Sequence, residues 1–85
     1  MSLMIYSVEH IANVDGDIMT TYKLFSTFEK AKERYDIVTK EVEKSFINEF
    51  GEGEFDYRTN GDRRCKFFAD DNNWDTLSID AKWVE

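Results

Sequence analysis

The chain of 85 residues contains no proline, one cysteine and one histidine. The lone cysteine, Cys65, excludes an internal disulfide and is typical of a protein from a reducing compartment. One cysteine and one histidine are also too few for a common zinc site. No apolar run approaches the roughly 18 residues needed to span a membrane, and the N-terminus lacks the layout of a signal peptide. We therefore expect a cytoplasmic protein with no metal and no cofactor.

Basic residues are scarce, because 11 Lys and Arg stand against 18 Asp and Glu, for a formal net charge of −7. An acidic protein repels phosphate backbones, so a general role in DNA or RNA binding is disfavoured. With 41% hydrophobic residues, the chain has the composition of one globular domain. Met1-Ser2-Leu3 precedes a second methionine and looks like a vector-derived leader. We expect residues 4–85 to form the single domain.

The central stretch, Ser26 to Phe50, has the pattern of one amphipathic helix. Ser26 and Glu29 form a capping-box signal at its start, and Gly51 follows as a stop. Between them, apolar residues recur in steps of three and four, which keeps one stripe on the same side of a helix. That stripe consists of Phe28, Ala31, Tyr35, Val38, Val42, Phe46 and Phe50.

The residues before the helix predict a β-hairpin, because two β-prone stretches, 4–14 and 18–25, flank Asp15-Gly16-Asp17. A two-residue loop would put Val8 opposite Lys23. A three-residue loop instead puts Glu9 opposite Lys23, an opposite-charge pair, and we prefer it for that reason. The preferred register places Val14 opposite Ile18, His10 opposite Tyr22, and Val8 opposite Leu24.

The residues after the helix predict a second hairpin and a last strand. Stretches 54–59 and 63–69 flank Asn60-Gly61-Asp62, and a three-residue loop pairs Phe55 with Phe67 and Tyr57 with Cys65. After a polar connection at 70–75, residues 76–84 alternate strictly and should pair antiparallel with the strand before them. Leu77, Ile79, Ala81 and Trp83 share one side of that strand.

The predicted fold is a single α+β domain of order β-β-α-β-β-β, with one long helix packed on one face of an antiparallel sheet. A helix of about 36 Å would overhang a sheet only about 20–25 Å across, leaving its end without partners. The opposite sheet face would retain Ile5, Ile11, Met19, Phe25 and Phe68. Leftover apolar surface of this kind indicates an interface. The candidate interface residues are Val42, Phe46, Ile47, Phe50, Ile5, Ile11 and Met19.

His10 and Cys65 are the residues from which catalysis would start. A general base needs a positioned carboxylate, yet Glu9, the neighbour of His10, points to the other side of a strand. Arg64 and Lys66 could activate Cys65, but strand alternation sends them to the opposite face. We expect a structural histidine, a buried inert thiol and no catalytic residues.

Two further clusters have weak functional readings. Asp71-Asn72-Asn73-Trp74-Asp75 begins like a calcium loop, but Thr76 stands where that loop needs glycine, and the stretch 13–17 fails in the same way at Ile18. Both are better interpreted as turns. A small basic cluster could bind phosphate, although nearby acids would neutralise much of it. Its members are Arg58, Arg63, Arg64 and Lys66.

One local pattern is similar to known sequences. Ile5-Tyr6-Ser7-Val8-Glu9-His10, an acidic turn, and then Leu24-Phe25-Ser26-Thr27-Phe28-Glu29-Lys30-Ala31 resemble the opening of small bacterial and prophage-type proteins. The resemblance covers about a third of the chain. It implies a hairpin running into a helix and a bacterial or phage origin, and it implies no activity.

These observations predict a non-enzymatic protein-binding domain that self-associates, most simply as a homodimer. One alternative is an acidic protein of a mobile element that mimics nucleic acid. Carboxylates gathered in one stripe would indicate it, whereas acids and bases are intermixed on this helix. The other alternative is a small ligand-binding domain or enzyme around His10, Tyr22 and Tyr57, which a polar pocket joining those residues would favour.

Overall fold

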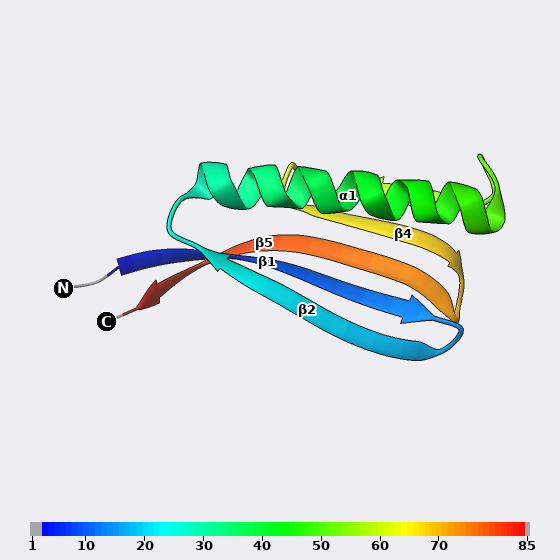
Figure 1. Ribbon diagram of the computed structural model, residues 1–85, viewed down its shortest axis with the longest axis horizontal. Helices are drawn as coiled ribbons and strands as arrows, with labels where there is room; N and C mark the ends of the chain where they lie inside the picture. Colours follow the sequence, from blue (N-terminus) through cyan, green and yellow to red (C-terminus); the bar gives the residue numbers. More distant parts are fainter. Residues whose placement is uncertain (1–2, 85) are drawn as a thin grey trace.

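A computed structural model describes residues 3–84 and contains five strands and one helix (Figure 1). The strands form one antiparallel sheet in the order β2-β1-β5-β4-β3, and α1 lies on one face of it. The predicted α+β fold and its element order are therefore confirmed. Of the expected leader, residues 1 and 2 lie outside the described range, and Leu3 begins β1. The elements are β1 (Leu3–Val14), β2 (Asp17–Phe25), α1 (Phe28–Phe50), β3 (Asp56–Thr59), β4 (Arg64–Asp70) and β5 (Asn73–Val84).

The helix begins one residue later than its capping signal predicts. Thr27, not Ser26, is the N-cap, with extended backbone angles of φ −132° and ψ 152° and a hydroxyl that accepts a 3.3 Å hydrogen bond from the Lys30 amide. The end at Phe50 is as predicted. Gly51 follows with φ +98°, and its amide donates to the Ile47 carbonyl at 2.9 Å. Within residues 3–84, no helix is long and apolar enough to cross a membrane.

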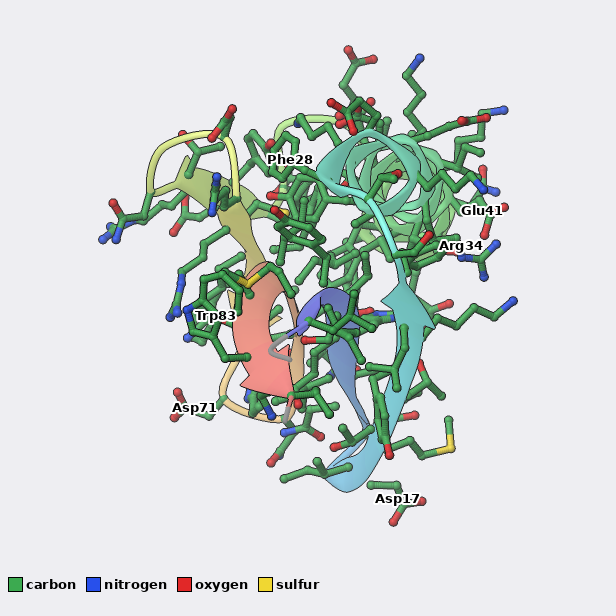
Figure 2. The ribbon with its side chains drawn as sticks, turned by 90° about the vertical axis from the view of Figure 1, so that its left-hand side faces the viewer. Asp17, Phe28, Arg34, Glu41, Asp71 and Trp83 are labelled. Carbon is green, nitrogen blue, oxygen red and sulfur yellow. The ribbon has the colours of Figure 1, made fainter. Side chains whose placement is uncertain are left out.

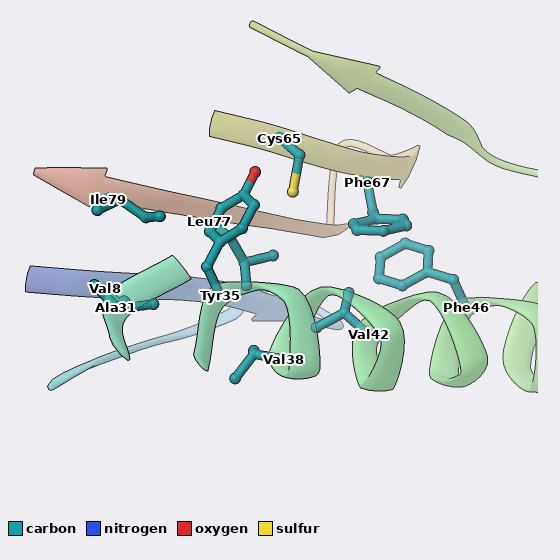
Figure 3. Close-up of a cluster of buried hydrophobic side chains, with 10 residues drawn as sticks. All are labelled: Val8, Ala31, Tyr35, Val38, Val42, Phe46, Cys65, Phe67, Leu77 and Ile79. Atoms are coloured by element: carbon teal, nitrogen blue, oxygen red, sulfur yellow. The ribbon is translucent and has the colours of Figure 1, made fainter. Parts of the chain in front are cut away.

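The core lies between α1 and the inner strands of the sheet (Figure 3). Five residues of the predicted helical stripe are buried in it, which confirms the period on which the helix prediction rested. Phe67 from β4 and Leu77 from β5 are the most completely enclosed large side chains, at 0% and 1% exposure. The buried cluster comprises Ala31, Tyr35, Val38, Val42 and Phe46 from the helix and Val8, Cys65, Phe67, Leu77 and Ile79 from the sheet.

The expected overhang of the helix is wrong. The helix runs along the strands rather than across them (Figure 1), and β1 and β5, with 12 residues each, are about 40 Å long at ~3.3 Å per residue. They match its 23 residues, which span about 34 Å. The end of the helix is covered within one chain, because the Phe46 ring packs against those of Phe50, Phe55 and Phe67 at centroid distances of 5.3–5.5 Å.

The register predicted for the first hairpin is wrong by one residue. Val14 pairs with Asp17, so the loop has two residues, and both have positive φ: 52° at Asp15 and 91° at Gly16. This is the type I′ geometry that Asp-Gly favours, and it outweighs the gain from opposing Glu9 to Lys23. A shift of one residue turns every β2 side chain to the other face. Val8 therefore lies opposite Lys23 and His10 opposite Thr21.

The second hairpin keeps the predicted faces but not the predicted pairs. Tyr57 lies opposite Phe67 and Thr59 opposite Cys65, a shift of two residues that preserves which side chains face the helix. The predicted connection at 70–75 is also too long. Residues 71–72 form a tight turn, and β5 begins at Asn73 and pairs antiparallel with β4 as expected. Of the residues predicted to share one side of β5, Leu77 and Ile79 are buried, whereas Trp83 is 68% exposed.

Candidate functional site

The helix covers the sheet unevenly, and strand β2 is left outside the core. Eight of its nine residues, Asp17 to Leu24, are exposed, and only Phe25 at its end is partly covered. Phe25 packs against the buried cluster, while Met19, on the same face, is 64% exposed. Because α1 does not cover most of β2, a groove remains between α1 and the β1–β2 hairpin.

This groove encloses about 620 Å³, within the size range of small-molecule sites. Its helical wall is mainly apolar, from Val38 through Val42 to Phe46. Charged residues border it as well: Lys23 on β2, and Arg34 and Glu41 on α1. Figure 2 shows Arg34 and Glu41 projecting from the same side of the helix, above β2. Cations and acids are mixed along the rim, so the groove has no single sign of charge.

His10 and Asp75 are in close polar contact with each other at the groove. The imidazole Nε2 lies 2.6 Å from Oδ2 of Asp75, and both residues border the groove. The Asp75 side chain is 11% exposed and the His10 side chain 24%. In the neutral tautomer that carries its proton on Nε2, the imidazole donates this hydrogen bond to the carboxylate, and Nδ1 is left as an acceptor. The sequence predicts Asp75 at the end of the polar connection 70–75 and not within a strand.

Of the three residues suggested for a polar pocket, two border the groove. His10 and Tyr22 line it, but Tyr57 does not. The Tyr57 ring packs on Phe67 at a centroid distance of 4.7 Å, on β3. Partial burial raises the pKa of the Tyr57 phenol above its ordinary value, and the Cys65 thiol adds to the increase.

Asn13 is a further polar residue at the border of the groove. It is 6% exposed, and its Oδ1 is the one buried side-chain oxygen or nitrogen in residues 3–84 without a hydrogen-bond partner. An unpaired buried acceptor costs about 1–3 kcal/mol. The sequence offers no signal for this residue, because Asn13 reads there as part of a turn.

The second distinct feature is the free edge of β2. This strand lies at one end of the sheet order, so one side of its backbone pairs with β1 and the other pairs with nothing in residues 3–84. Its large exposed apolar side chains are 59–66% exposed. They are Ile18, Met19, Tyr22 and Leu24.

The candidate interface residues are dispersed. Val42 and Phe46 are buried in the core, and Phe50 packs against it, so the helix end does not offer them to a partner. Ile5, Ile11 and Ile47 are partly buried. Met19 and Phe25 were expected on the face away from the helix, which is wrong, because Met19 opposes Ala12 and Phe25 opposes Tyr6 on the covered face.

The basic cluster is split between the two faces of the sheet. Arg63 covers the Phe28 ring at 4.6 Å, whereas Arg64 binds Asp80 at 3.1 Å. Arg58 lies opposite Lys66, whose ammonium sits 5.3 Å from the Phe68 ring and 5.4 Å from the Trp74 ring. Three of the four basic residues, Arg63, Arg64 and Lys66, therefore already contact a neighbouring acidic or aromatic side chain.

The two calcium-like stretches form the neighbouring turns at one end of the sheet. Asp70 Oδ1 accepts from the Asn72 amide at 2.8 Å and from the Asn73 side chain at 3.0 Å. The Asp15 amide donates to Asn73 Oδ1, and the Gly16 amide to the Asn72 carbonyl. Within the described residues, no group of three or more His, Cys, Asp or Glu side chains is placed to hold a metal ion.

Cys65 lies in the core, where its Sγ is 3.8 Å from the Thr39 hydroxyl.

Comparison of the chain with protein-family models, with curated proteins and with solved structures found no match.

Proposed function

We propose that this chain is a non-enzymatic protein-interaction domain that self-associates, and that its interface is the free edge of β2. The supporting observation is the exposure of this strand on both faces over eight residues, together with an outer edge that pairs with no strand of residues 3–84. An exposed edge strand is a template for a further strand. Apolar side chains on such an edge favour a protein partner.

The opposite edge of the sheet is a poorer candidate. Strand β3 has four residues, and two of them, Asp56 and Arg58, are charged. Short length and charge are the devices by which edges avoid pairing. Strand β2 has nine residues and only two charged ones, Asp17 and Lys23. Of the two edges, β2 is therefore the one open to strand addition.

The charge of the chain supports the same class of partner. A net charge of −7 disfavours phosphate backbones and anionic membrane surfaces alike. The single buried thiol of Cys65 supports a reducing, cytoplasmic setting for the interaction.

The test is the mass of the protein in solution by light scattering, with two matched variants. Leu24→Lys places a charge beside the β2 edge, where edge lysines block pairing. Ile37→Lys makes the same change at another exposed apolar residue, on α1, 45% exposed against 59% for Leu24. We expect a dimer for the parent and for Ile37→Lys, and a monomer for Leu24→Lys. A parent that is monomeric, or two variants that behave alike, would reject the proposal.

A second candidate function, binding of a small molecule, rests on the groove with its His10–Asp75 pair. The probe is anilinonaphthalene sulfonate, whose fluorescence rises in apolar sites. Ser45→Trp would fill the groove, which Ser45 lines, and Glu43→Trp places the same ring on an exposed helical residue that does not line it. Loss of binding in the first variant alone supports this function, and equal binding in both rejects it.

A further inference from the structure

We infer that two copies of this chain pair β2 against β2 antiparallel, with Thr21 of each copy facing Thr21 of the other on a twofold axis. The inference rests on the proposed function and adds its geometry. The two five-stranded sheets would then form one continuous sheet. An isologous contact of this kind closes on itself, because the same patch serves both copies.

Alternate residues of β2 direct their backbone groups at the free edge. The two residues that flank a two-residue loop, Val14 and Asp17, form a hydrogen-bonded pair, and such pairs alternate along an antiparallel ladder. Asp17, Met19, Thr21, Lys23 and Phe25 therefore direct their amides and carbonyls at β1. The groups that face outward belong to the alternate residues: Ile18, Thr20, Tyr22 and Leu24.

The register of the pairing follows from this alternation. The outward-facing backbone groups of one copy must meet the outward-facing groups of the other. This condition allows the twofold axis to pass through any β2 residue, and each choice of axis forms different residue pairs. With Thr21 on the axis, all nine residues of β2 find an opposite, and about eight backbone hydrogen bonds form. With Thr20 on the axis, Lys23 would face Asp17 of the other copy, but only about six bonds form. The loop cannot extend that shorter ladder, because the Gly16 amide already donates to Asn72.

Magnitudes decide between these two registers. A net backbone hydrogen bond is worth roughly as much as, or more than, an exposed cross-strand ion pair. The longer ladder is therefore preferred. It also opposes Ile18 to Leu24 and Thr20 to Tyr22 on the face away from the helix, where each apolar side chain meets an apolar or β-branched one. No like charges face each other.

The test is disulfide cross-linking by single cysteine variants. Thr21 would form a non-hydrogen-bonded pair with its copy, with Cα atoms about 4.5 Å apart, inside the ~4.4–6.8 Å range of disulfides. Thr20 would face Tyr22, so its own copy lies about 7–8 Å away diagonally. Both threonines are exposed, so neither change disturbs the core, and Cys65 is buried and should not react.

Under mild oxidation, we expect T21C to form a disulfide dimer at least about ten times faster than T20C. Faster cross-linking of T20C, or equal rates, would overturn the Thr21 register while leaving self-association intact. Two uncross-linked variants of a parent that is dimeric by mass would overturn the β2 axis alone. Two uncross-linked variants of a monomeric parent would overturn the proposed function with it.

Discussion

The imidazole of His10 and the carboxylate of Asp75 meet at 2.6 Å across 65 positions of sequence, and they join two adjacent strands beneath the helix. Asp75 is nearly buried, and His10 is the hydrogen-bond partner of its carboxylate. The pair explains how an acid tolerates an inward position on β5, between the apolar residues of the core and the edge of the groove. A buried carboxylate without a partner is strongly disfavoured.

The first prediction concerns the strength of this contact. In a double-mutant cycle of His10→Ala and Asp75→Ala, chemical denaturation should give a coupling free energy of about 1.5–3 kcal/mol, because the hydrogen bond involves a charged group. The control is the same cycle on Arg64 and Asp80, which are 3.1 Å apart but 61% and 41% exposed. There the coupling should be about 0–1 kcal/mol. Equal values in the two cycles would contradict the account of Asp75.

The second prediction concerns the aromatic cluster at the end of the helix. Phe67 is fully enclosed and contacts the rings of Phe46, Phe55 and Tyr57, so Phe67→Ala should lower the free energy of unfolding by about 3–5 kcal/mol. Trp83→Ala removes a larger side chain that is 68% exposed, and it should cost less than about 0.5 kcal/mol. Denaturant midpoints at constant m-value measure both. A small loss for Phe67→Ala would mean that the helix end is not packed as described.

The third prediction is a loss of stability at alkaline pH. Burial raises the pKa of the Tyr35 phenol well above its ordinary value of 10.0, and the Cys65 thiol beside it adds to the increase. The unfolded chain therefore loses this proton near pH 10 while the folded chain keeps it. Stability is complete below about pH 10 and should fall above it by up to about 1.4 kcal/mol per pH unit.

The control for this effect is a phenylalanine substitution at two tyrosines. Tyr35→Phe removes the buried phenol and should reduce the alkaline loss, whereas Tyr22→Phe, at a residue 66% exposed, should not. Urea unfolding between about pH 8 and pH 11 gives the comparison. If both variants follow the parent curve, the burial of Tyr35 is not the cause.

The fourth prediction tests the two-residue loop of the first hairpin. Gly16 has φ +91°, a conformation that strains other residues, so Gly16→Ala should destabilise the protein by about 1–2 kcal/mol. Asp15→Asn should be nearly neutral, because asparagine also accepts the left-handed φ of 52° found there. A three-residue loop would place different demands on both positions. A neutral Gly16→Ala would therefore argue for that alternative register.

The helix and the faces of most strands could be predicted from sequence, because they follow from local periodicity. The helical period of 3.6 residues is enough to predict the buried stripe from Ala31 to Phe46. The strand period of 2 is enough to place Leu77 and Ile79 on the same face. The hairpin register needed more. There a cross-strand charge pair, Glu9 with Lys23, was weighed above loop conformation, and the positive φ values of Asp15 and Gly16 show that the turn decides.

The candidate site could not be predicted in the same way, because its parts come together only through non-local pairing. The position of β5 between β1 and β4 brings Asp75 to His10, and no pattern near either residue indicates it. The groove depends on which strands of the sheet α1 covers. Because the helix runs along the strands, Phe46 is buried over the sheet and does not extend beyond it.

Sedimentation equilibrium tests the central claim, self-association through β2, most directly. The chain has a mass of 10.1 kDa, and we expect the average mass to rise toward twice that value between about 1 µM and about 500 µM protein. The Leu24→Lys variant should remain at the mass of one chain throughout. A parent protein that stays at 10.1 kDa over the whole range would contradict the account.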